Sequence, residues 1–507
     1  MWRLLRTGAT FERTGAMREI LDAFGVGGWS RLAVRALARP FGLFGRSGDP
    51  SLPPVARALQ AMGPAYVKFG QILSTRRDIV GDELVGQLRV LQDRLPPFPI
   101  DEARAEIEHE LGPAVWDLLG DLSEPIAAAS IAQVHAATWI PTGEKVAVKI
   151  LRPGVRRKFR QDIGAFHFIA AVVEFLVPMS RRLRPNAIVD HFESVVNAEL
   201  DLRLEAAAAS EFRENTLNDP KLHIPTVEWE ATSRRILVLE WVEGSMVEPE
   251  ALARAGHDLP ELSGHVLQTF LRHALRDGLF HADMHQGNLR VRADGTLVLL
   301  DFGIMGRLDP MTRRHYAEIL HGFLTRNYRR VAEVHFEAGY VPADRDVDAF
   351  AQALRAVGEP IFGRDASAIS MARVLAYLLE TTERFGMATR TELILLQRTM
   401  VVVEGVARTL NPDANIFNAA KPVVEEYIRH HLGPASIASN VYQTGVILTR
   451  LGPRLPGLAQ ELVMLAEEAR VRRALPPPPP PRRMAGWVRL AGVLLVGLGI
   501  GVAIMSL

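Results

Sequence analysis

Apolar and polar positions divide the body of the chain into two regions. Residues from about 111 to 242 combine helical spacing with runs rich in β-branched residues, whereas residues from about 243 to 475 follow mostly helical spacing, with one short strand pair. The apolar run Ile163–Met179 is interrupted by His167 and Glu174, so it predicts a core helix rather than a membrane span. The pattern therefore predicts a helix-rich α+β protein.

The first predicted strand pair carries a charged residue in an apolar setting. It joins Ile131–Trp139 to Glu144–Leu151 through the turn residues Pro141-Thr142-Gly143. The second strand has the β-branched composition of a buried strand and contains Lys149. A lysine is costly to bury alone, so an anionic partner is expected beside it. Upstream, four small side chains allow either close approach of a ligand or close packing: Ala127, Ala128, Ala129 and Ser130.

The second predicted strand pair places two oxygen-bearing side chains at the mouth of a hairpin. Leu289–Val291 and Thr296–Leu300 flank Asp294-Gly295, which is a strong signal for a tight hairpin turn. Symmetric pairing about that turn sets Asn288 opposite Asp301, with their side chains about 5 Å apart. An amide oxygen and a carboxylate are suitable ligands for a hard cation such as Mg²⁺.

The motifs around this hairpin follow the order found in the protein-kinase fold. Asp283 precedes Asn288 by five residues, and the hairpin leads on to Asp301-Phe302-Gly303. In that fold the first aspartate orients the acceptor, the asparagine and the second aspartate hold magnesium, and an upstream strand lysine holds phosphates. With Val146-Ala147-Val148-Lys149 upstream, the ordered set predicts a two-lobed kinase-like fold.

The strand lysine of such a fold is paired with a glutamate on a helix. A helix is predicted over His191–Phe212, and it contains several acids about 40 to 60 residues after Lys149. Glu193, Glu199 and Asp201 are the candidates, and spacing alone does not choose among them. Most acids on such a helix form a solvated face.

Composition and charge exclude several other classes of protein. The 507 residues are 48% hydrophobic and 23% charged, which excludes a disordered or collagen-like chain. Because there is no cysteine, disulfides, thiolate nucleophiles and cysteine-ligated metals are ruled out. With 59 basic and 58 acidic residues the formal charge is +1, so no nucleic-acid partner is expected.

Both ends of the chain carry membrane signals. Residues 1–47 hold eight arginines and no lysine, interleaved with aromatic residues, which suits an anionic lipid surface or an ordinary pair of docked helices. Leu490–Leu507 contains no charge and is about 27 Å long as a helix, close to the thickness of a hydrocarbon core. Arginines lie only on its N-terminal side, which predicts a membrane anchor with the body in the cytoplasm. Gly497 and Gly501 have the spacing that allows a homodimer.

Together these motifs resemble the UbiB family of atypical kinase-like proteins, also called the ADCK family. Lys68-Phe69-Gly70-Gln71 matches its K-x-G-Q motif, and Leu91-Gln92-Asp93 with Pro96-Pro97 matches the stretch that follows. Ala127–His135 matches the alanine-rich loop that replaces the kinase glycine-rich loop. The other matches are Glu193 as the helix glutamate, Glu199-Leu200-Asp201 as the E-x-D motif, and Gln397-Arg398-Thr399 as a late motif.

The resemblance implies a cleft that binds ATP with Mg²⁺. In it Lys149 would clamp phosphates, Asn288 and Asp301 would hold the metal, and Asp283 would orient the attacking group. Lys68 and Gln71, on a helix over the cleft, would gate it. The remaining implied nucleotide-site residues are Ala127, Ala128, Ala129, Ser130, Glu193, Glu199 and Asp201.

Bacterial members support ubiquinone biosynthesis, so the resemblance implies a kinase or ATPase at the inner (cytoplasmic) membrane. Its partners would be anionic lipid and quinone-biosynthesis enzymes or lipid precursors. Ala282 stands where protein kinases have arginine, and members look more like ATPases or small-molecule kinases than protein kinases. The alternative is an ATP-switched module that lifts a quinone precursor from the bilayer, with incidental ATPase activity. An aminoglycoside- or choline-type kinase shares the catalytic loop but explains neither the K-x-G-Q helix nor the tail.

The chain departs from the family pattern in the catalytic loop and at the tail. It has His285-Gln286-Gly287-Asn288 where many members have H-P-G-N, and it has one apolar tail segment where bacterial members often have two. The six proline residues Pro476–Pro481 predict an extended spacer. The expected parts are a basic amphipathic segment (1–50), a K-x-G-Q helical extension (51–110), a small lobe (111–242), a large lobe (243–475), a proline linker (476–484) and a transmembrane helix (485–507).

Overall fold

A computed structural model describes most of the chain between residues 2 and 431. The described ranges are 2–23, 44–74, 77–91, 96–176, 184–362 and 390–431, with a few positions between 377 and 387. Within these ranges, no helix combines the length and the apolar character needed to cross a membrane. The predicted proline linker (476–484) and transmembrane helix (485–507) lie outside the described residues.

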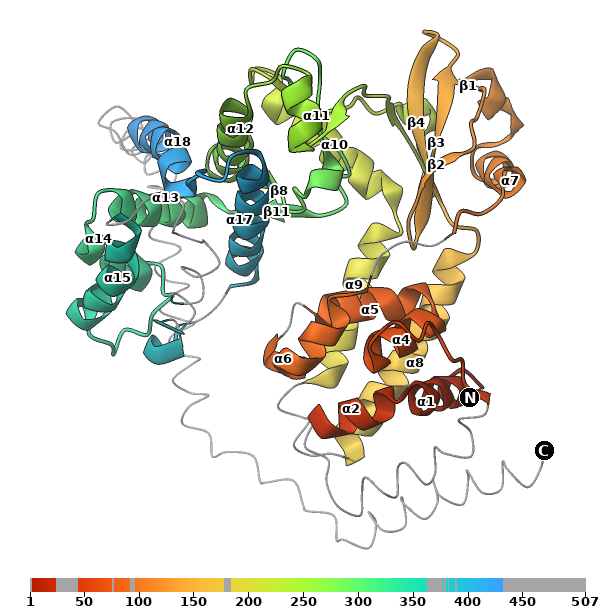
Figure 1. The fold of residues 1–507 in the computed structure, drawn as a ribbon, viewed down its shortest axis with the longest axis horizontal. Coiled ribbons are helices and arrows are strands. Elements are labelled where there is room, and N and C mark those ends of the chain that lie inside the picture. The colour runs from red at the N-terminus through yellow and green to blue at the C-terminus, as the bar shows by residue number, and fades with distance from the viewer. Residues whose placement is uncertain are drawn as a thin grey trace, which may run out of the picture. The chain divides into compact units, whose positions relative to one another are not determined.

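The small lobe is an antiparallel sheet that contains the first predicted strand pair. The sheet has the order β1-β3-β4-β6 with β2 beside β3 (Figure 1), and Trp139 pairs with Glu144 as predicted. Helix α7 (Ile100–Leu111), which falls within the predicted extension, shares this lobe's hydrophobic core through Ala103 and Ile107. The strands are β1 (Leu119–Gly120), β2 (Pro125–Ala128), β3 (Ala132–Trp139), β4 (Glu144–Leu151) and β6 (Ile236–Glu240).

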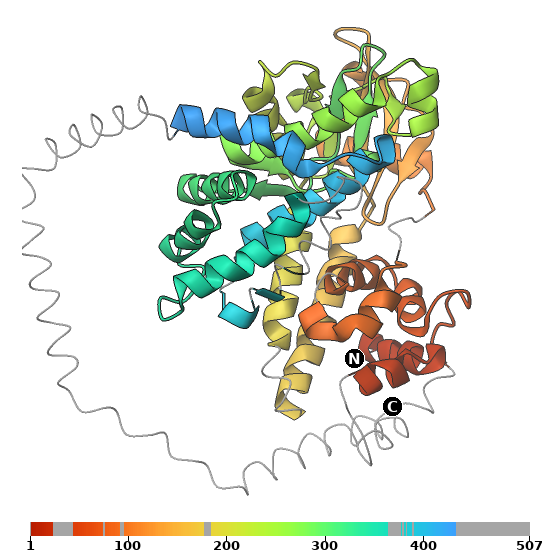
Figure 2. The ribbon, with the colours of Figure 1, turned by 60° about the vertical axis from the view of Figure 1, so that its left-hand side comes forward.

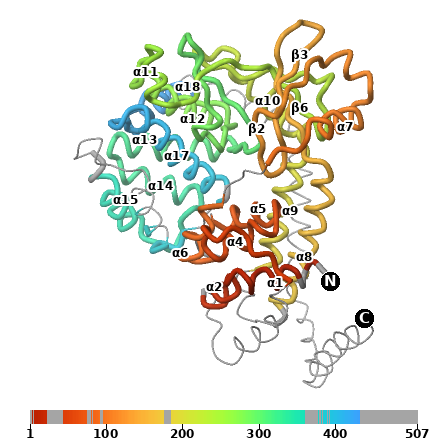
Figure 3. The backbone as a smooth tube through the Cα atoms, turned by 45° about the vertical axis from the view of Figure 1, so that its right-hand side comes forward, coloured from red at the N-terminus to blue at the C-terminus, as the bar shows by residue number. Residues whose placement is uncertain are grey.

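Two long helices, α8 (Val155–Leu176) and α9 (Pro185–Glu199), follow the first hairpin and carry the extension. Figure 3 shows the N-terminal helices gathered around them, and rings of Tyr66 and Phe69 pack on Phe166 of α8. Part of α8 is exposed, notably Phe168, so it is only partly the core helix predicted. The extension helices are α4 (Pro54–Met62), α5 (Pro64–Leu73) and α6 (Arg77–Leu88), and the N-terminal segment before them contains α1 (Trp2–Thr14) and α2 (Ala16–Ala23).

The N-terminal helix is docked on this extension. Arg3 pairs with Asp162 of α8, and the Thr7 hydroxyl lies 2.7 Å from the hydroxyl of Tyr66. Phe11 packs against the main hydrophobic core. Arg3 and Phe11 therefore contribute to the docking of this helix.

The single helix predicted over His191–Phe212 is wrong, because the chain breaks between α9 and α10 (Leu202–Thr216). Asp201 is the N-cap of α10, and its carboxylate accepts a hydrogen bond from the backbone N–H of Arg203. Such a cap stabilises a new helix start rather than continuation of the preceding helix. The side chains of α10 therefore do not continue the helical faces of α9.

The large lobe is mostly helical, as predicted. Figure 2 shows α17 and α18, in blue, against the green helices of this lobe. Two small sheets lie within it, with the orders β5-β10-β9-β7 and β11-β8, where a single strand pair was predicted. Strand β5 comes from the range predicted for the small lobe. The strands are β5 (Leu222–His223), β7 (Ser245–Met246), β8 (Leu279–His281), β9 (Leu289–Val291), β10 (Leu297–Leu299) and β11 (Met305–Arg307). The helices are α11 (Pro249–Arg254), α12 (Leu259–Arg272), α13 (Pro310–Leu324), α14 (Tyr328–Glu337), α15 (Val347–Phe362), α17 (Thr391–Leu410) and α18 (Ile416–His431).

Candidate active site

The β9–β10 hairpin forms as predicted, but its register differs by one residue. Leu299 pairs with Leu289, and the backbone N–H of Leu300 donates to the carbonyl of Asn288. Asn288 therefore lies opposite Leu300, and the predicted pairing with Asp301 is wrong. The cause is a longer turn, in which Arg292 pairs with Thr296 across three residues and Gly295 takes the left-handed conformation with φ 82°.

Lys149 lies between two carboxylates at the junction of the lobes. Its Nζ is 2.7 and 2.9 Å from the two carboxylate oxygens of Glu205 on α10. The same nitrogen is 3.3 Å from Oδ1 of Asp301. Lys149 and Glu205 are largely buried, whereas half of the Asp301 side chain is exposed. The anion expected beside the strand lysine is therefore present, but it is Glu205 that pairs most closely.

These three charges shift one another's pKa values. The ammonium of Lys149 is the main cause that lowers the pKa of Asp301, to about 2. Burial opposes the charge of Lys149, but the Asp301 and Glu205 carboxylates outweigh it and raise the pKa of Lys149. Burial raises the pKa of Glu205 to about 7, with Asp301 acting in the same direction and Lys149 opposing it. At neutral pH Asp301 and Lys149 are therefore charged.

The catalytic loop is held in place by backbone-directed hydrogen bonds. Nε2 of His281 lies 2.9 Å from the carbonyl oxygen of Asp301, and its Nδ1 accepts the N–H of Asp283. His281 is therefore a structural residue of this loop. The side-chain nitrogen of Asn288 donates to the carbonyl of Asp283 at 3.0 Å, which leaves the amide oxygen of Asn288 as the atom suited to a cation. The carboxylate of Asp283 is partly exposed.

The late motif Gln397-Arg398-Thr399 braces this loop from α17. The hydroxyl of Thr399, which is fully buried, is 3.1 Å from the carbonyl of Ala282. Gln286, in the position where many family members have proline, reaches Thr409 on the same helix at 3.0 Å. The loop thus rests on a helix more than a hundred residues further along the chain.

The alanine-rich loop closes the edge of the small lobe near Lys149. Ala127 and Ala128 belong to β2, and the N–H of Ala129 donates to the carbonyl of Ala132 to form a tight turn. The hydroxyl of Ser130 is buried, and it has no hydrogen-bond partner among the residues that the structure describes. A buried hydroxyl without a partner is costly, so it fits a polar ligand at this loop.

The K-x-G-Q motif lies on α5 and contacts the E-x-D motif. Nζ of Lys68 is 2.8 Å from a carboxylate oxygen of Glu199, and both side chains are largely buried. A Cβ on Gly70 would lie 2.6 Å from the end of the Leu91 side chain and 2.7 Å from that of Leu59, so a larger residue would require both leucines to shift. The side-chain nitrogen of Gln71 is 3.4 Å from the carbonyl of Leu91. The two family motifs therefore form one structural unit.

Two acids predicted to lie at the nucleotide site have other contacts. Glu193 pairs with His167 of α8 at 2.9 Å, so the prediction that Glu193 is the partner of Lys149 is wrong. Asp201 caps α10 and binds the guanidinium groups of Arg203 and Arg234. The glutamate that pairs with Lys149 is instead Glu205, 56 residues after the lysine.

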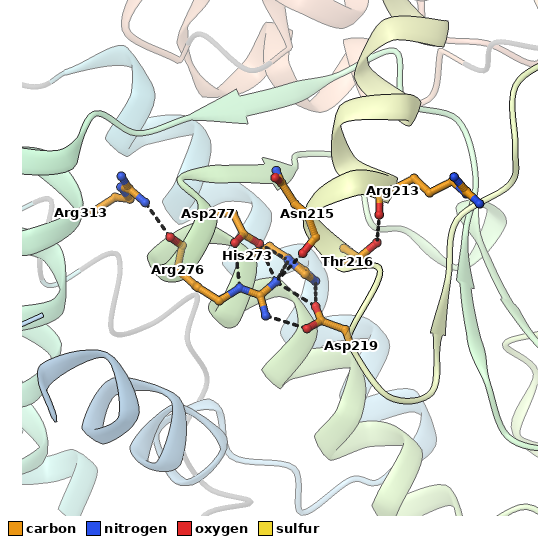
Figure 4. A network of polar contacts seen from close by, with 8 residues as sticks. All are labelled: Arg213, Asn215, Thr216, Asp219, His273, Arg276, Asp277 and Arg313. Carbon is orange, nitrogen blue, oxygen red and sulfur yellow. Dashed lines mark hydrogen bonds and ion pairs between the residues drawn. The ribbon is translucent and has the colours of Figure 1, made fainter. Parts of the chain in front are cut away.

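A buried polar network fixes the end of α10 that lies away from Glu205 (Figure 4). Arg276 binds both carboxylate oxygens of Asp219, at 2.6 and 2.9 Å, and the carbonyl of Asn215 at the end of α10. Nδ1 of His273 is 2.7 Å from a carboxylate oxygen of Asp277. The ring of His273 packs on Phe212, which packs in turn on Phe302 of the D-F-G motif. The helix that carries Glu205 is therefore anchored to the large lobe.

Comparison with known proteins identifies the family of the chain. Residues 90–335 match the ABC1 atypical kinase-like domain, and residues 354–415 match the UbiB helical domain. A Marinobacter nauticus protein named "Probable protein kinase UbiB" is 40% identical over 413 residues, which cover 80% of this chain and 75% of that protein. This chain belongs to the UbiB family. The predicted resemblance and the kinase-like fold are thereby confirmed.

Other UbiB-family relatives show similar agreement. The Shewanella piezotolerans protein with the same name is 39% identical and covers 79% of this chain and 74% of that protein. The Azotobacter vinelandii protein is 39% identical and covers 78% of this chain and 75% of that protein.

A solved structure is also similar to this chain. The structure of Rv3197 from Mycobacterium tuberculosis, in complex with erythromycin, is 26% identical with a TM-score of 0.51 and covers 70% of this chain and 90% of that chain.

Proposed function

We propose that this UbiB-family protein is a membrane-anchored atypical kinase or ATPase that binds ATP with Mg²⁺ and supports ubiquinone biosynthesis. The observation that carries the proposal is the contact of Lys149 with both Glu205 and Asp301. In kinases the strand lysine paired with a helix glutamate positions phosphates, and the D-F-G aspartate holds the metal. Here all three groups come from separate elements and meet within hydrogen-bond or ion-pair distance.

The donor set suits a nucleotide and its metal. The carboxylate of Asp301 and the amide oxygen of Asn288 are the oxygen ligands that Mg²⁺ prefers, and the ion would neutralise charge on the phosphates. Lys149 would bind phosphate oxygens, and the hydroxyl of Ser130 would donate to the same group from the alanine-rich loop (Ala127–Ser130). Asp283, whose carboxylate is partly exposed, would orient the attacking hydroxyl or water.

The acceptor is proposed to be water, a lipid or another small molecule rather than a protein. Lys68 and Gln71 on α5, together with Glu199 and Asp201, would govern access to the cleft. Quinone precursors, quinone-biosynthesis enzymes and anionic lipid are the proposed partners. The relatives carry the name "Probable protein kinase UbiB", and the same lysine, glutamate and aspartate would serve phosphoryl transfer to any hydroxyl.

Turnover of ATP by the purified full-length protein tests this function. We expect magnesium-dependent hydrolysis that increases with anionic liposomes and a phenolic quinone precursor, followed with γ-labelled ATP. Label transferred to the precursor supports a kinase. Release of phosphate alone supports an ATPase where hydrolysis also proceeds without lipid, and it supports the ATP-switched module where hydrolysis is slow and requires lipid. If neither nucleotide binding nor turnover depends on magnesium, the proposal is wrong.

We propose that residues 485–507 anchor the protein in the inner membrane, with the catalytic body in the cytoplasm. We expect deletion of 485–507 to move the protein from the membrane pellet to the soluble fraction, because the uncharged run Leu490–Leu507 would be lost. Fractionation of cells expressing both forms, with a wash at high salt, measures the change. A truncated protein that still pellets at high salt would show that another segment is the main anchor.

A further inference from the structure

The segment Pro96–Pro99 connects two separate hydrophobic cores. Leu91, before the segment, is buried in the core shared with the extension, where it packs over Gly70 of the K-x-G-Q motif. Phe98, within the segment, is buried in the core of the small lobe together with Ile107. Only six residues separate Leu91 from Phe98 in the chain, so the distance by which the extension can shift relative to the small lobe is limited.

Gln133 on β3 binds this segment as a neighbouring strand would. Its side-chain oxygen accepts the N–H of Phe98 at 2.9 Å, and its side-chain nitrogen donates to the carbonyl of Phe98 at 3.2 Å. The same nitrogen is 2.8 Å from Nε2 of His135, whose Nδ1 is 2.7 Å from the carbonyl of Ser123. Burial lowers the pKa of His135, so its neutral ring can accept from Gln133. These contacts explain the polar residues in the Gln133-Val134-His135 part of the loop motif.

Arg152 joins the same segment to the alanine-rich loop. Its Nε donates to the carbonyl of Ala129 at 2.9 Å, and its Nη2 donates to the carbonyl of Pro96 at 2.9 Å. Its guanidinium also lies 5.7 Å from the centre of the Phe98 ring. Because the guanidinium is rigid and planar, it fixes the distance between the two carbonyl groups it binds. The alanine-rich loop and the segment after the extension are thus bridged by one side chain.

We propose that Arg152 and Gln133 are positioning residues that couple the alanine-rich loop to the K-x-G-Q extension through Pro96–Pro99. Movement of the extension then changes the affinity of the loop for nucleotide phosphates. Bound nucleotide shifts the equilibrium between positions of the extension by the same coupling free energy. The proposal rests on the nucleotide binding proposed above. Neither residue is placed among the groups proposed to react. Their role is to hold the small lobe and Pro96–Pro99 in a fixed arrangement.

Arg152→Lys tests this coupling, because lysine keeps the charge but has one nitrogen and cannot bridge the two carbonyl groups. Gly70→Ala supplies the perturbation, since the added Cβ displaces Leu91 without removing any polar group. We expect Gly70→Ala to weaken binding of magnesium–nucleotide by about fivefold in the wild-type background and by less than twofold in the Arg152→Lys background. Isothermal titration with a non-hydrolysable ATP analogue measures all four proteins, and Arg157→Lys, an exposed position on α8, is the control background.

Hydrogen exchange gives a second readout that a purely structural role does not change. In the wild-type protein we expect the nucleotide analogue to slow exchange in residues 96–103 as well as in 127–133. In Arg152→Lys only 127–133 is expected to respond. Equal effects of Gly70→Ala in both backgrounds, or protection of 96–103 that persists in Arg152→Lys, would overturn the coupling. If the wild-type protein binds no magnesium–nucleotide at all, the proposed function fails first and the coupling falls with it.

Discussion

Asp301→Asn is expected to lower the affinity for magnesium–ATP by at least about 100-fold, because it removes the only charged group of the two oxygen ligands proposed for Mg²⁺. The substitution removes the carboxylate proposed to hold Mg²⁺ and the negative charge that lies 3.3 Å from Lys149. The pKa of Asp301 is lowered to about 2, so this charge is present throughout the range in which the protein is assayed. Isothermal titration with ATP in the presence and absence of magnesium measures the effect.

Asparagine is the right replacement because Asp301 has a φ of 59°, in the left-handed region that asparagine tolerates better than other side chains. The side chain is half exposed, so we expect the melting temperature to change little. Asp294→Asn is a matched control, because Asp294 is an exposed residue in the nearby hairpin turn, where it accepts from the N–H of Thr296. Unchanged magnesium-dependent affinity in Asp301→Asn, beside an unchanged Asp294→Asn, would refute the metal assignment.

The groups that the sequence predicted correctly are those fixed by short-range motifs. Lys149 lies in a strand of β-branched residues, and Asp301 follows a hairpin whose turn contains Asp294-Gly295. Local sequence patterns predicted the element to which each residue belongs. The order of the kinase-type motifs then predicted that Lys149 and Asp301 would lie close together, and their 3.3 Å contact confirms this. Motif order is informative here because it reflects the topology of the fold rather than the contacts of any one residue.

The register of the hairpin was missed because sequence does not fix the length of a turn by itself. Asp294-Gly295 is compatible with a loop of two residues and with a loop of three in which the glycine is left-handed. The structure has the longer loop, with the N–H of Arg292 bonded to the carbonyl of Thr296. Because the loop has one residue more, each residue before the turn faces a partner one position earlier than predicted. Asn288 therefore lies opposite Leu300 rather than Asp301.

The partner of Lys149 was missed because a spacing of about 40 to 60 residues does not choose among the acids that follow the lysine. The family resemblance then favoured Glu193, which lies on α9 and contacts His167, whereas Glu205 lies on a separate helix that begins after Asp201. A signal was nevertheless present: Glu205 lies on the stripe formed by Leu202, Ala209 and Phe212, which are buried at helical spacing. An acid within an apolar stripe is a buried acid, and a buried acid needs a cation.

Glu205→Gln is expected to reduce magnesium–ATP binding and turnover by about 10- to 100-fold. The substitution removes the carboxylate on α10 that pairs with Lys149. Glu193→Gln is the matched control, since Glu193 was the sequence-predicted partner but instead contacts His167. We expect Glu193→Gln to retain wild-type turnover. Titration and steady-state hydrolysis of both variants decide the assignment, and similar losses in the two would contradict it.

The same pair of variants tests the raised pKa of Glu205. Because that pKa is raised to about 7, the folded protein binds a proton at Glu205 more tightly than the unfolded chain does. The resulting stability is present below the ordinary glutamate pKa and is lost as pH rises through about 7. The melting temperature of the wild-type protein should therefore fall relative to Glu205→Gln between pH 5 and pH 8, whereas Glu193→Gln should follow the wild type. A difference between wild type and Glu205→Gln that does not change with pH would show that Glu205 is already ionised at pH 5, and that Lys149 outweighs its burial.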